Sequence, residues 1–171
     1  MIIVLRIGHR IERDKRITTH VALAARAFGA DGIFITTKDV KIRKNIQSVC
    51  KRFGDEFQIE TGIEAKKIIK SWNGTIVHLT MYGSELDKAI AHIDTNRDML
   101  IIVGAEKVPP YFFKIADFNI SVGNQPHSEV SALALFLDRY TKAAWQSKDF
   151  HGNIQIIPCA NTKKIISKGT T

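Results

Sequence analysis

The sequence predicts an α/β protein with a mostly parallel sheet and helices on both faces. Runs of apolar, β-branched residues alternate with segments of helical periodicity, and this alternation is typical of strands joined by crossover helices. Two of the runs, 2–7 (IIVLRI) and 99–104 (MLIIVG), have the composition of buried strands. The chain has 171 residues and shows no linker, internal repeat or low-complexity segment, so a single domain, 1–171, is expected.

Strands and helices are expected in alternating order along the chain. The expected strands are 2–7, 31–37, 57–61, 75–80, 99–104 and a short segment from 118. The first helix is expected to follow a cap at Thr18 or Thr19 and to end at Gly29, after a charged loop over 8–16. The other expected helices are 39–53, 63–71, 84–93, 109–116 and 128–139, followed by a basic tail.

The composition is that of a soluble protein with a polyanionic partner. Lysine and arginine number 25 against 17 aspartate and glutamate residues, which gives a net charge of +8. Such a charge favours nucleic acid binding through attraction to phosphates, although many small basic proteins bind none. Lys41 and Lys44 lie on the polar face of the helix expected at 39–53, which adds to the charged loop before it.

The cysteines and the apolar runs limit the compartment and the chemistry. Cys50 and Cys159 are far apart and lack metal-ligand spacing, so reduced thiols and no metal site are expected. No signal peptide is evident and no apolar run reaches membrane-spanning length, so a cytoplasmic protein is expected.

Three polar loops follow expected strands, at 78–83, 103–110 and 122–129. Ligand sites in parallel sheets gather at the carboxyl ends of the strands, so these loops are expected to meet at one site. Gly104 and Gly123 allow close approach of backbone to a ligand or a positive φ. No G-x-G-x-x-G, P-loop, G-x-S-x-G or H-E-x-x-H pattern occurs, so the nucleophile and metal chemistries that those motifs support are not expected.

The helix expected after the third loop is apolar on nearly all sides. One face carries Val130, Leu133, Ala134, Leu137 and Tyr140, and another carries Ala132, Leu135 and Phe136. Such a helix is expected to bury one face in the core and the other, with Leu135 and Phe136, against a partner.

Four blocks of the sequence resemble a known family. They are GHRIERDKRITTHVALAARAFGADGI, LTMYG, IIVGAEKVP and ADFNISVGNQPHSEVSALALFLDR, in this order. Together they resemble the archaeal tRNA cytidine-56 2′-O-methyltransferases, which belong to the trefoil-knotted SPOUT superfamily. The resemblance implies a C-terminal trefoil knot, S-adenosylmethionine as methyl donor, a homodimer, and methyl transfer to a ribose 2′-hydroxyl in the T loop of tRNA.

By position, the resemblance also implies which residues bind the cofactor. They would come from all three loops: Leu79, then Gly104, Ala105, Glu106, Lys107 and Val108, then Val122, Gly123, Asn124, Gln125, Pro126, His127, Ser128 and Glu129. Of these, Ser128 is the expected N-cap of the following helix, and His127 is expected to shape the loop.

The expected catalytic residues come from the charged first block. Many 2′-O-methyltransferases of the superfamily have an arginine six residues before the glycine of the AFG turn, but here that position is Leu23. Arg16 and then His20 are the candidates to replace it, Arg16 to steady the ribose and phosphate and His20 as a general base. Arg10 and Arg13, with Lys41 and Lys44, are expected to contact RNA.

Two alternatives remain open from the sequence. The first is a knotted RNA-binding protein without activity, which saturable binding of S-adenosylmethionine would argue against. The second is a base methyltransferase of the same superfamily, which differs in the position of the product methyl.

Overall fold

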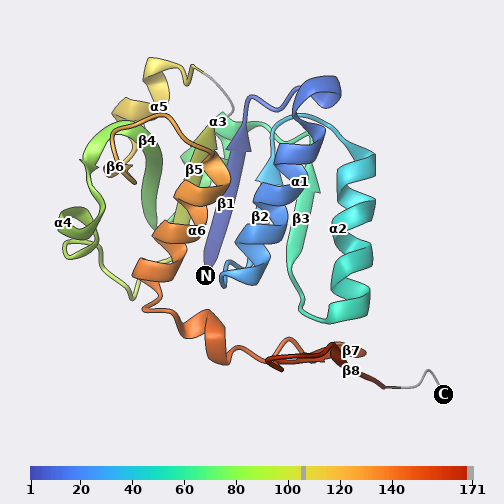
Figure 1. The fold of residues 1–171 in the computed structure, drawn as a ribbon. Coiled ribbons are helices and arrows are strands. Elements are labelled where there is room, and N and C mark those ends of the chain that lie inside the picture. The colour runs from blue at the N-terminus through green and yellow to red at the C-terminus, as the bar shows by residue number, and fades with distance from the viewer. Residues whose placement is uncertain (105–106, 169–171) are drawn as a thin grey trace.

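A computed structural model, in which residues 1–104 and 107–168 are described, has a six-stranded sheet covered by helices on both faces (Figure 1). The strand order is β3-β2-β1-β5-β4-β6, and every pairing in this sheet is parallel. The predicted fold class is therefore confirmed. The chain returns to the middle of the sheet with β5, which lies between β1 and β4; the threading of a trefoil knot stays a prediction.

The strands and helices have the following bounds. The parallel strands are β1 Ile2–Ile7, β2 Gly32–Ile35, β3 Gln58–Thr61, β4 Thr75–Glu85, β5 Met99–Gly104 and β6 Phe118–Ser121. The helices are α1 Ile11–Ala27, α2 Val40–Phe53, α3 Ala65–Ser71, α4 Leu86–Ile90, α5 Pro110–Ile115, α6 Glu129–Tyr140 and the short 3₁₀ helix η1 Ala144–Ser147. An antiparallel hairpin that was not predicted, β7 Ile154–Ile157 with β8 Lys164–Ser167, lies at the edge of the molecule where the parallel strands begin (Figure 1).

The sheet separates two apolar cores. Side chains alternate between the faces of a strand, so Val4 of β1 packs on the side of α1, α2 and α6, whereas Ile3, Leu5 and Ile7 pack on the side of α3 and α5. The central strands β1 and β5 pair along their whole lengths and are covered on both faces, which explains why both read as continuous apolar runs. Because all six strands of this sheet run parallel, their carboxyl ends lie at one edge of the sheet.

The first helix begins earlier than the sequence predicted, at Ile11 rather than at a cap on Thr18 or Thr19. The reason is Asp14, whose Oδ2 accepts the Arg10 backbone N–H at 3.0 Å and the Arg10 Nε–H at 2.9 Å. The side-chain hydrogen bonds from Arg10 lower the pKa of Asp14 to about 2, so this carboxylate stays ionised and holds the first turn in mildly acidic solution. The expected charged loop is therefore largely helical, and the expected end at Gly29 is confirmed by its φ of 94° after the last turn.

The faces of α6 also differ from the prediction. Phe136 is completely buried in the core of its own subunit, so its assignment to a subunit interface was wrong, whereas Leu135 is 41% exposed. The true core stripe is Leu133, Phe136, Leu137 and Tyr140, which are spaced by three and four residues and therefore share one face. Phe136 and Tyr140 stack with ring centroids 5.8 Å apart.

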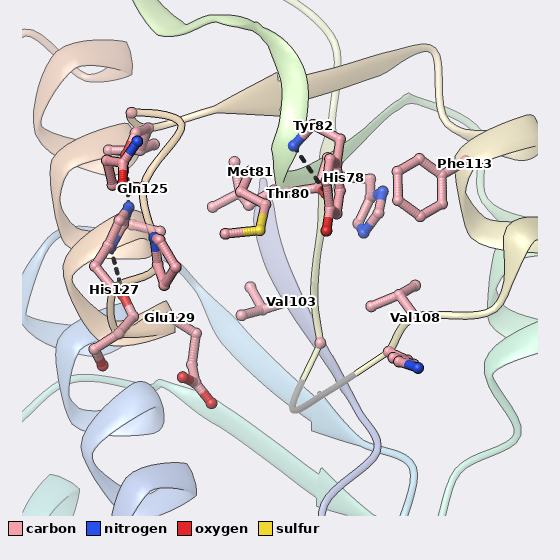
Figure 2. A pocket seen from close by; sticks show the side chains of 18 of the residues that line it. His78, Thr80, Met81, Tyr82, Val103, Val108, Phe113, Gln125, His127 and Glu129 are labelled. Carbon is pink, nitrogen blue, oxygen red and sulfur yellow. Dashed lines mark hydrogen bonds between the residues drawn. The ribbon is translucent and has the colours of Figure 1, made fainter.

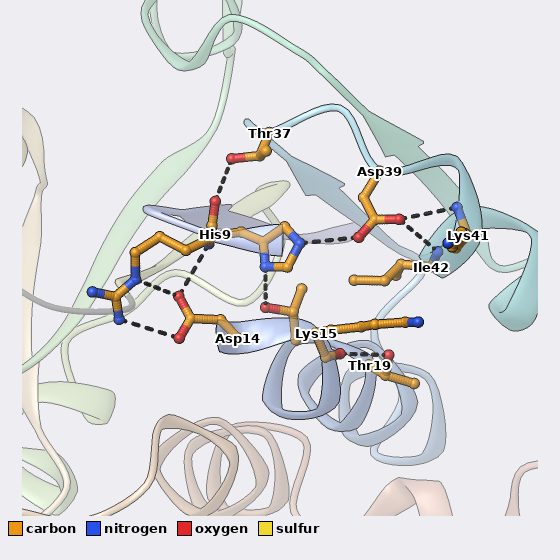
Figure 3. Close-up of polar contacts among 10 residues, drawn as sticks. His9, Asp14, Lys15, Thr19, Thr37, Asp39, Lys41 and Ile42 are labelled. Atoms are coloured by element: carbon orange, nitrogen blue, oxygen red, sulfur yellow. Dashed lines mark hydrogen bonds and ion pairs between the residues drawn. The ribbon is translucent and has the colours of Figure 1, made fainter. Parts of the chain in front are cut away.

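A buried polar cluster joins the middle of α1 to the start of α2 (Figure 3). His9 lies between them, with Nε2 3.2 Å from Asp39 Oδ2 and Nδ1 3.0 Å from Thr18 Oγ1. Asp39 is also the N-cap of α2, because its Oδ1 accepts the N–H groups of Lys41 and Ile42. Burial acts to raise the pKa of Asp39, but hydrogen bonds from those N–H groups and from His9 outweigh burial and lower it.

Asp39 therefore has two separable functions that substitutions should resolve. Asp39→Ala removes both the cap and the partner of His9, and should lower the free energy of unfolding by about 2–4 kcal/mol. Asp39→Asn keeps a good cap and should lose clearly less. Urea unfolding at neutral pH measures both, and an Asp39→Ala variant as stable as the parent would contradict this account.

Candidate functional site

A cavity of about 760 Å³ opens at the carboxyl ends of β4, β5 and β6 (Figure 2). Its volume lies in the range typical of sites for drug-sized ligands and cofactors. The cavity lies where the three polar loops meet, which is the edge that the parallel-sheet argument predicted.

Most of the residues expected to bind a cofactor line this one cavity. They are Leu79, Gly104, Lys107, Val108, Val122, Gly123, Gln125, Pro126, His127, Ser128 and Glu129. Ala105 and Glu106 lie outside the described residues. Asn124 does not line the cavity; its Nδ2 donates to the Met81 carbonyl at 2.7 Å and so ties the third loop to the first.

The first loop is an excursion from β4. Leu79 and Ser84 both pair with Ile120 of β6, so residues 80–83 leave the sheet between them. Gly83 makes this possible by close approach, because a Cβ there would lie 2.5 Å from the carbonyl of Asn119. The excursion carries Thr80, Met81 and Tyr82 to the cavity.

The third loop is fixed by its own side chains. His127 Nε2 donates to the Val122 carbonyl at 2.6 Å, across the loop. Gly123 has a φ of 75°, a conformation that residues with a side chain rarely adopt. The Ser128 hydroxyl accepts the Val130 N–H at 3.2 Å as the N-cap of α6. The expected cap is confirmed, and His127 holds the loop's shape.

A buried ion pair lies beside the cavity. Arg6 of β1 is completely buried and its Nη2 donates to Glu129 Oε1 at 2.6 Å. Glu129 lines the cavity and its side chain is 23% exposed. Arg6 Nε and Nη1 are buried with no hydrogen-bond partner among the described residues, so Glu129 is the one carboxylate that the structure pairs with this guanidinium.

Sequence reasoning expected the three loops at the site but named only some of their lining residues, and it missed Arg6. The lining residues of the expected loops that were not named singly are His78, Thr80, Met81, Tyr82, Val103, Pro109 and Pro110, and Phe113 and Ala132 lie outside those loops. The sequence does single out Arg6 and His78, because each is a polar residue inside an apolar strand. Burial of such a side chain costs free energy unless it has a hydrogen-bond partner.

The expected catalytic residues lie elsewhere on the chain. Arg16 and His20 are exposed on α1, where they line a separate surface hollow of about 350 Å³ together with Thr19. Neither lines the main cavity of the same chain.

The residues expected to contact RNA lie near the starts of two helices. Arg10 is the N-cap residue of α1 and pairs with Asp14, and Arg13 lies in the first turn of this helix. Lys41 and Lys44 are exposed in the first turns of α2. Both helices begin at the edge where β1 and β2 end, which is the same edge of the sheet as the cavity (Figure 1).

Neither a membrane-spanning helix nor a metal-binding cluster occurs among the described residues. No helix in the described ranges is long and apolar enough to cross a membrane. Within residues 1–104 and 107–168, no three histidine, cysteine, aspartate or glutamate side chains gather as a metal ion would require.

Comparison with known proteins decides the family. The family model described as tRNA ribose 2′-O-methyltransferase, aTrm56, matches residues 53–166. A tRNA (cytidine(56)-2′-O)-methyltransferase of Thermococcus kodakarensis is 52% identical over 174 residues, which cover 97% of each chain. This chain belongs to the tRNA ribose 2′-O-methyltransferase family.

A second relative is similar in sequence, and more distant solved structures share the fold. The chain is 53% identical to the methyltransferase of the same name from Picrophilus torridus, and spans 48% of that longer protein. The SpoU methyltransferase AviRb from Streptomyces viridochromogenes, crystallised with AdoMet, shares the fold with a TM-score of 0.60 at 12% identity, over 83% of this chain and 57% of that one. The A. aeolicus TrmH/SpoU tRNA modifying enzyme gives 0.59 at 16% identity, over 89% and 78%.

The buried ion pair of this methyltransferase predicts an asymmetric response to substitution. Glu129→Ala leaves the buried Arg6 guanidinium without its carboxylate and should lower the free energy of unfolding by about 3–5 kcal/mol. Adding Arg6→Met removes the stranded charge, so the double variant should be more stable than Glu129→Ala alone. Urea unfolding of the three variants measures this, and a loss below about 1 kcal/mol in Glu129→Ala would contradict it.

Proposed function

We propose that this protein transfers a methyl group from S-adenosylmethionine to the ribose 2′-hydroxyl of cytidine 56 in the T loop of tRNA. The proposal rests chiefly on the identity of 52% over 97% of both chains to a relative that carries this activity in its name. A tRNA substrate would place the enzyme in the cytoplasm.

The cavity suits S-adenosylmethionine in size and in the distribution of polarity. Leu79, Val108 and Phe113 supply apolar walls, and Glu129 supplies a carboxylate at another wall. In addition, His78 presents a buried ring nitrogen, Nε2, that has no hydrogen-bond partner among the described residues. Apolar walls with a few placed polar groups are typical of cofactor sites.

When bound, S-adenosylmethionine supplies an activated methyl on a positively charged sulfur. The protein has to align the ribose 2′-oxygen with that methyl and to accept or disperse the hydroxyl proton. Alignment alone contributes up to about 7–11 kcal/mol to lowering such barriers. We assign the placement of the ribose and phosphate to Arg16, and the proton to His20, a side-chain class that commonly acts as general base.

These two residues are proposed to act across a homodimer. Arg16 and His20 are exposed on α1 and do not line the cavity of their own chain. An isologous dimer would bring α1 of one subunit to the cavity of the other, so that each site contains residues of both chains.

The exposed lysines at the start of α2 are proposed to bind the phosphates of the tRNA. Lys41 and Lys44 are exposed near the start of α2, at the edge of the sheet where the cavity opens. Cations there would bind tRNA phosphates beside a ribose held at the site, with the +8 net charge attracting the RNA from a distance.

The function is tested by locating the transferred methyl. An unmodified tRNA transcript incubated with labelled S-adenosylmethionine should yield 2′-O-methylcytidine after nuclease digestion. A transcript that already carries 2′-O-methylcytidine at position 56 should accept no label. Methyl on a base would indicate a base methyltransferase, and cofactor binding without transfer would indicate an inactive RNA-binding protein.

The shared site is tested by complementation. Arg16→Ala should lose turnover but bind S-adenosylmethionine, and Gly104→Leu should lose cofactor binding because a side chain enters the cavity lining. After subunit exchange, about half of the dimers are mixed and each holds one complete site, so about a quarter of the parental activity should return.

Mass measurement of the exchanged sample provides the control. If mixed dimers form and activity does not return, Arg16 acts within its own chain or has no part in turnover.

A further inference from the structure

We infer that His78 is the residue with which the cavity recognises the 6-amino group of adenine, and thus selects an adenosyl ligand. This inference rests on the proposed function, because it takes the cavity as the cofactor site. It assigns a specificity-determining contact to a residue in the middle of a buried strand.

His78 is fixed within the sheet at the cavity wall. It pairs with Ile102 of β5 and with Asn119 of β6, is completely buried, and is among the residues that line the cavity. Its ring packs edge-on against Phe113 with centroids 4.6 Å apart. Figure 2 shows both rings on the opposite side of the cavity from His127 and Glu129.

A chain of hydrogen bonds determines which nitrogen of His78 carries the proton. Asn119 Nδ2 donates to the Phe113 carbonyl at 2.9 Å, so the amide oxygen of Asn119 is the atom that faces His78. That oxygen accepts from His78 Nδ1 at 2.8 Å. Nδ1 is therefore the protonated nitrogen, and Nε2 carries a lone pair.

The lone pair on His78 Nε2 accepts no hydrogen bond from the described residues. Among the described residues no hydrogen-bond partner reaches this atom, which is buried. Burial lowers the pKa of His78, although the hydrogen bond to Asn119 acts to raise it. The ring is therefore neutral near pH 7, and Nε2 remains an acceptor. An unmet buried acceptor destabilises a protein, and a ligand donor would satisfy it.

The side chains around His78 favour one of the hydrogen-bond donors of S-adenosylmethionine as the partner of Nε2. These donors are the α-ammonium, the ribose hydroxyls and the adenine 6-amino group. Phe113, which packs against His78, and Val108, which lies on the same side of the cavity (Figure 2), make this part of the cavity apolar. Such surroundings disfavour an ammonium and suit a flat aromatic ring. Nε2 is buried in the structure, so an adenine reaches it only when the side chains that cover it move.

Two matched ligands test the contact without any need for turnover. S-adenosylhomocysteine carries the 6-amino donor, whereas S-inosylhomocysteine carries a 6-oxo acceptor at the same place. Calorimetry on the unaltered protein should give an affinity about tenfold or more higher for the adenosyl ligand. If neither ligand binds, the proposed function fails; if both bind equally, the proposed role of His78 fails.

Variants then locate the discrimination. His78→Phe keeps an aromatic ring but removes the acceptor, and should bring the two affinities within about threefold of each other. Tyr82→Phe is the matched control, because Tyr82 also lines the cavity, is 80% exposed, and keeps its aromatic ring when its polar group is removed. It should leave the affinity ratio unchanged. Discrimination that survives in a folded His78→Phe overturns the inference.

A measurement on the unaltered protein covers the case in which His78→Phe does not fold. The ¹⁵N resonance of the unprotonated His78 Nε2 should move to lower frequency when S-adenosylhomocysteine binds, as it does for an imidazole nitrogen that accepts a hydrogen bond. S-inosylhomocysteine should leave this resonance in place. An Nε2 signal that responds equally to both ligands, or to neither, refutes the assignment.

Discussion

The ion pair between Arg6 and Glu129 fixes the geometry on which the rest of the site depends. It joins Arg6, near the end of β1, to Glu129, the first residue of α6, which lies 123 positions further along the chain. Because Arg6 is completely buried, the guanidinium is stable there only with Glu129 in place. The pair therefore ties the first residue of α6 to β1, next to the Ser128 cap and the third loop that His127 holds in shape.

The architecture could be predicted because local sequence and tertiary burial agree. The central strands β1 and β5 are apolar on both faces, so their composition alone identifies them. The convergence of the three loops follows from parallel strand direction and needs no contact information. The start of α1 could not be found in the same way, since a single carboxylate, Asp14, extends the helix by bonding back to Arg10. Phe136 was misplaced because an all-round apolar helix does not reveal its core stripe.

The chemistry of the cavity depends on contacts between distant residues. His78 has a free acceptor only because Asn119, 41 residues away, faces it with an amide oxygen, and Asn119 does so only because its nitrogen is held by the Phe113 carbonyl. No periodicity or motif encodes such a chain of bonds. The positions of the expected strand ends indicated the loops, but the strand register, which sets His78 opposite Asn119, determines which atom of His78 is left without a partner.

The polar cluster around His9 has a consequence for the thermodynamics of RNA association. Thr18 in the middle of α1 and Asp39 at the start of α2 contact the same imidazole ring, so the two helices that carry the basic side chains are held together by buried polar contacts. Their backbones bring little conformational freedom to be lost when a polyanion binds. The entropy lost on ordering would then come mainly from the long cationic side chains themselves. A tRNA would meet a surface on which the backbone positions of the basic residues are set before contact, while their side chains become ordered on binding.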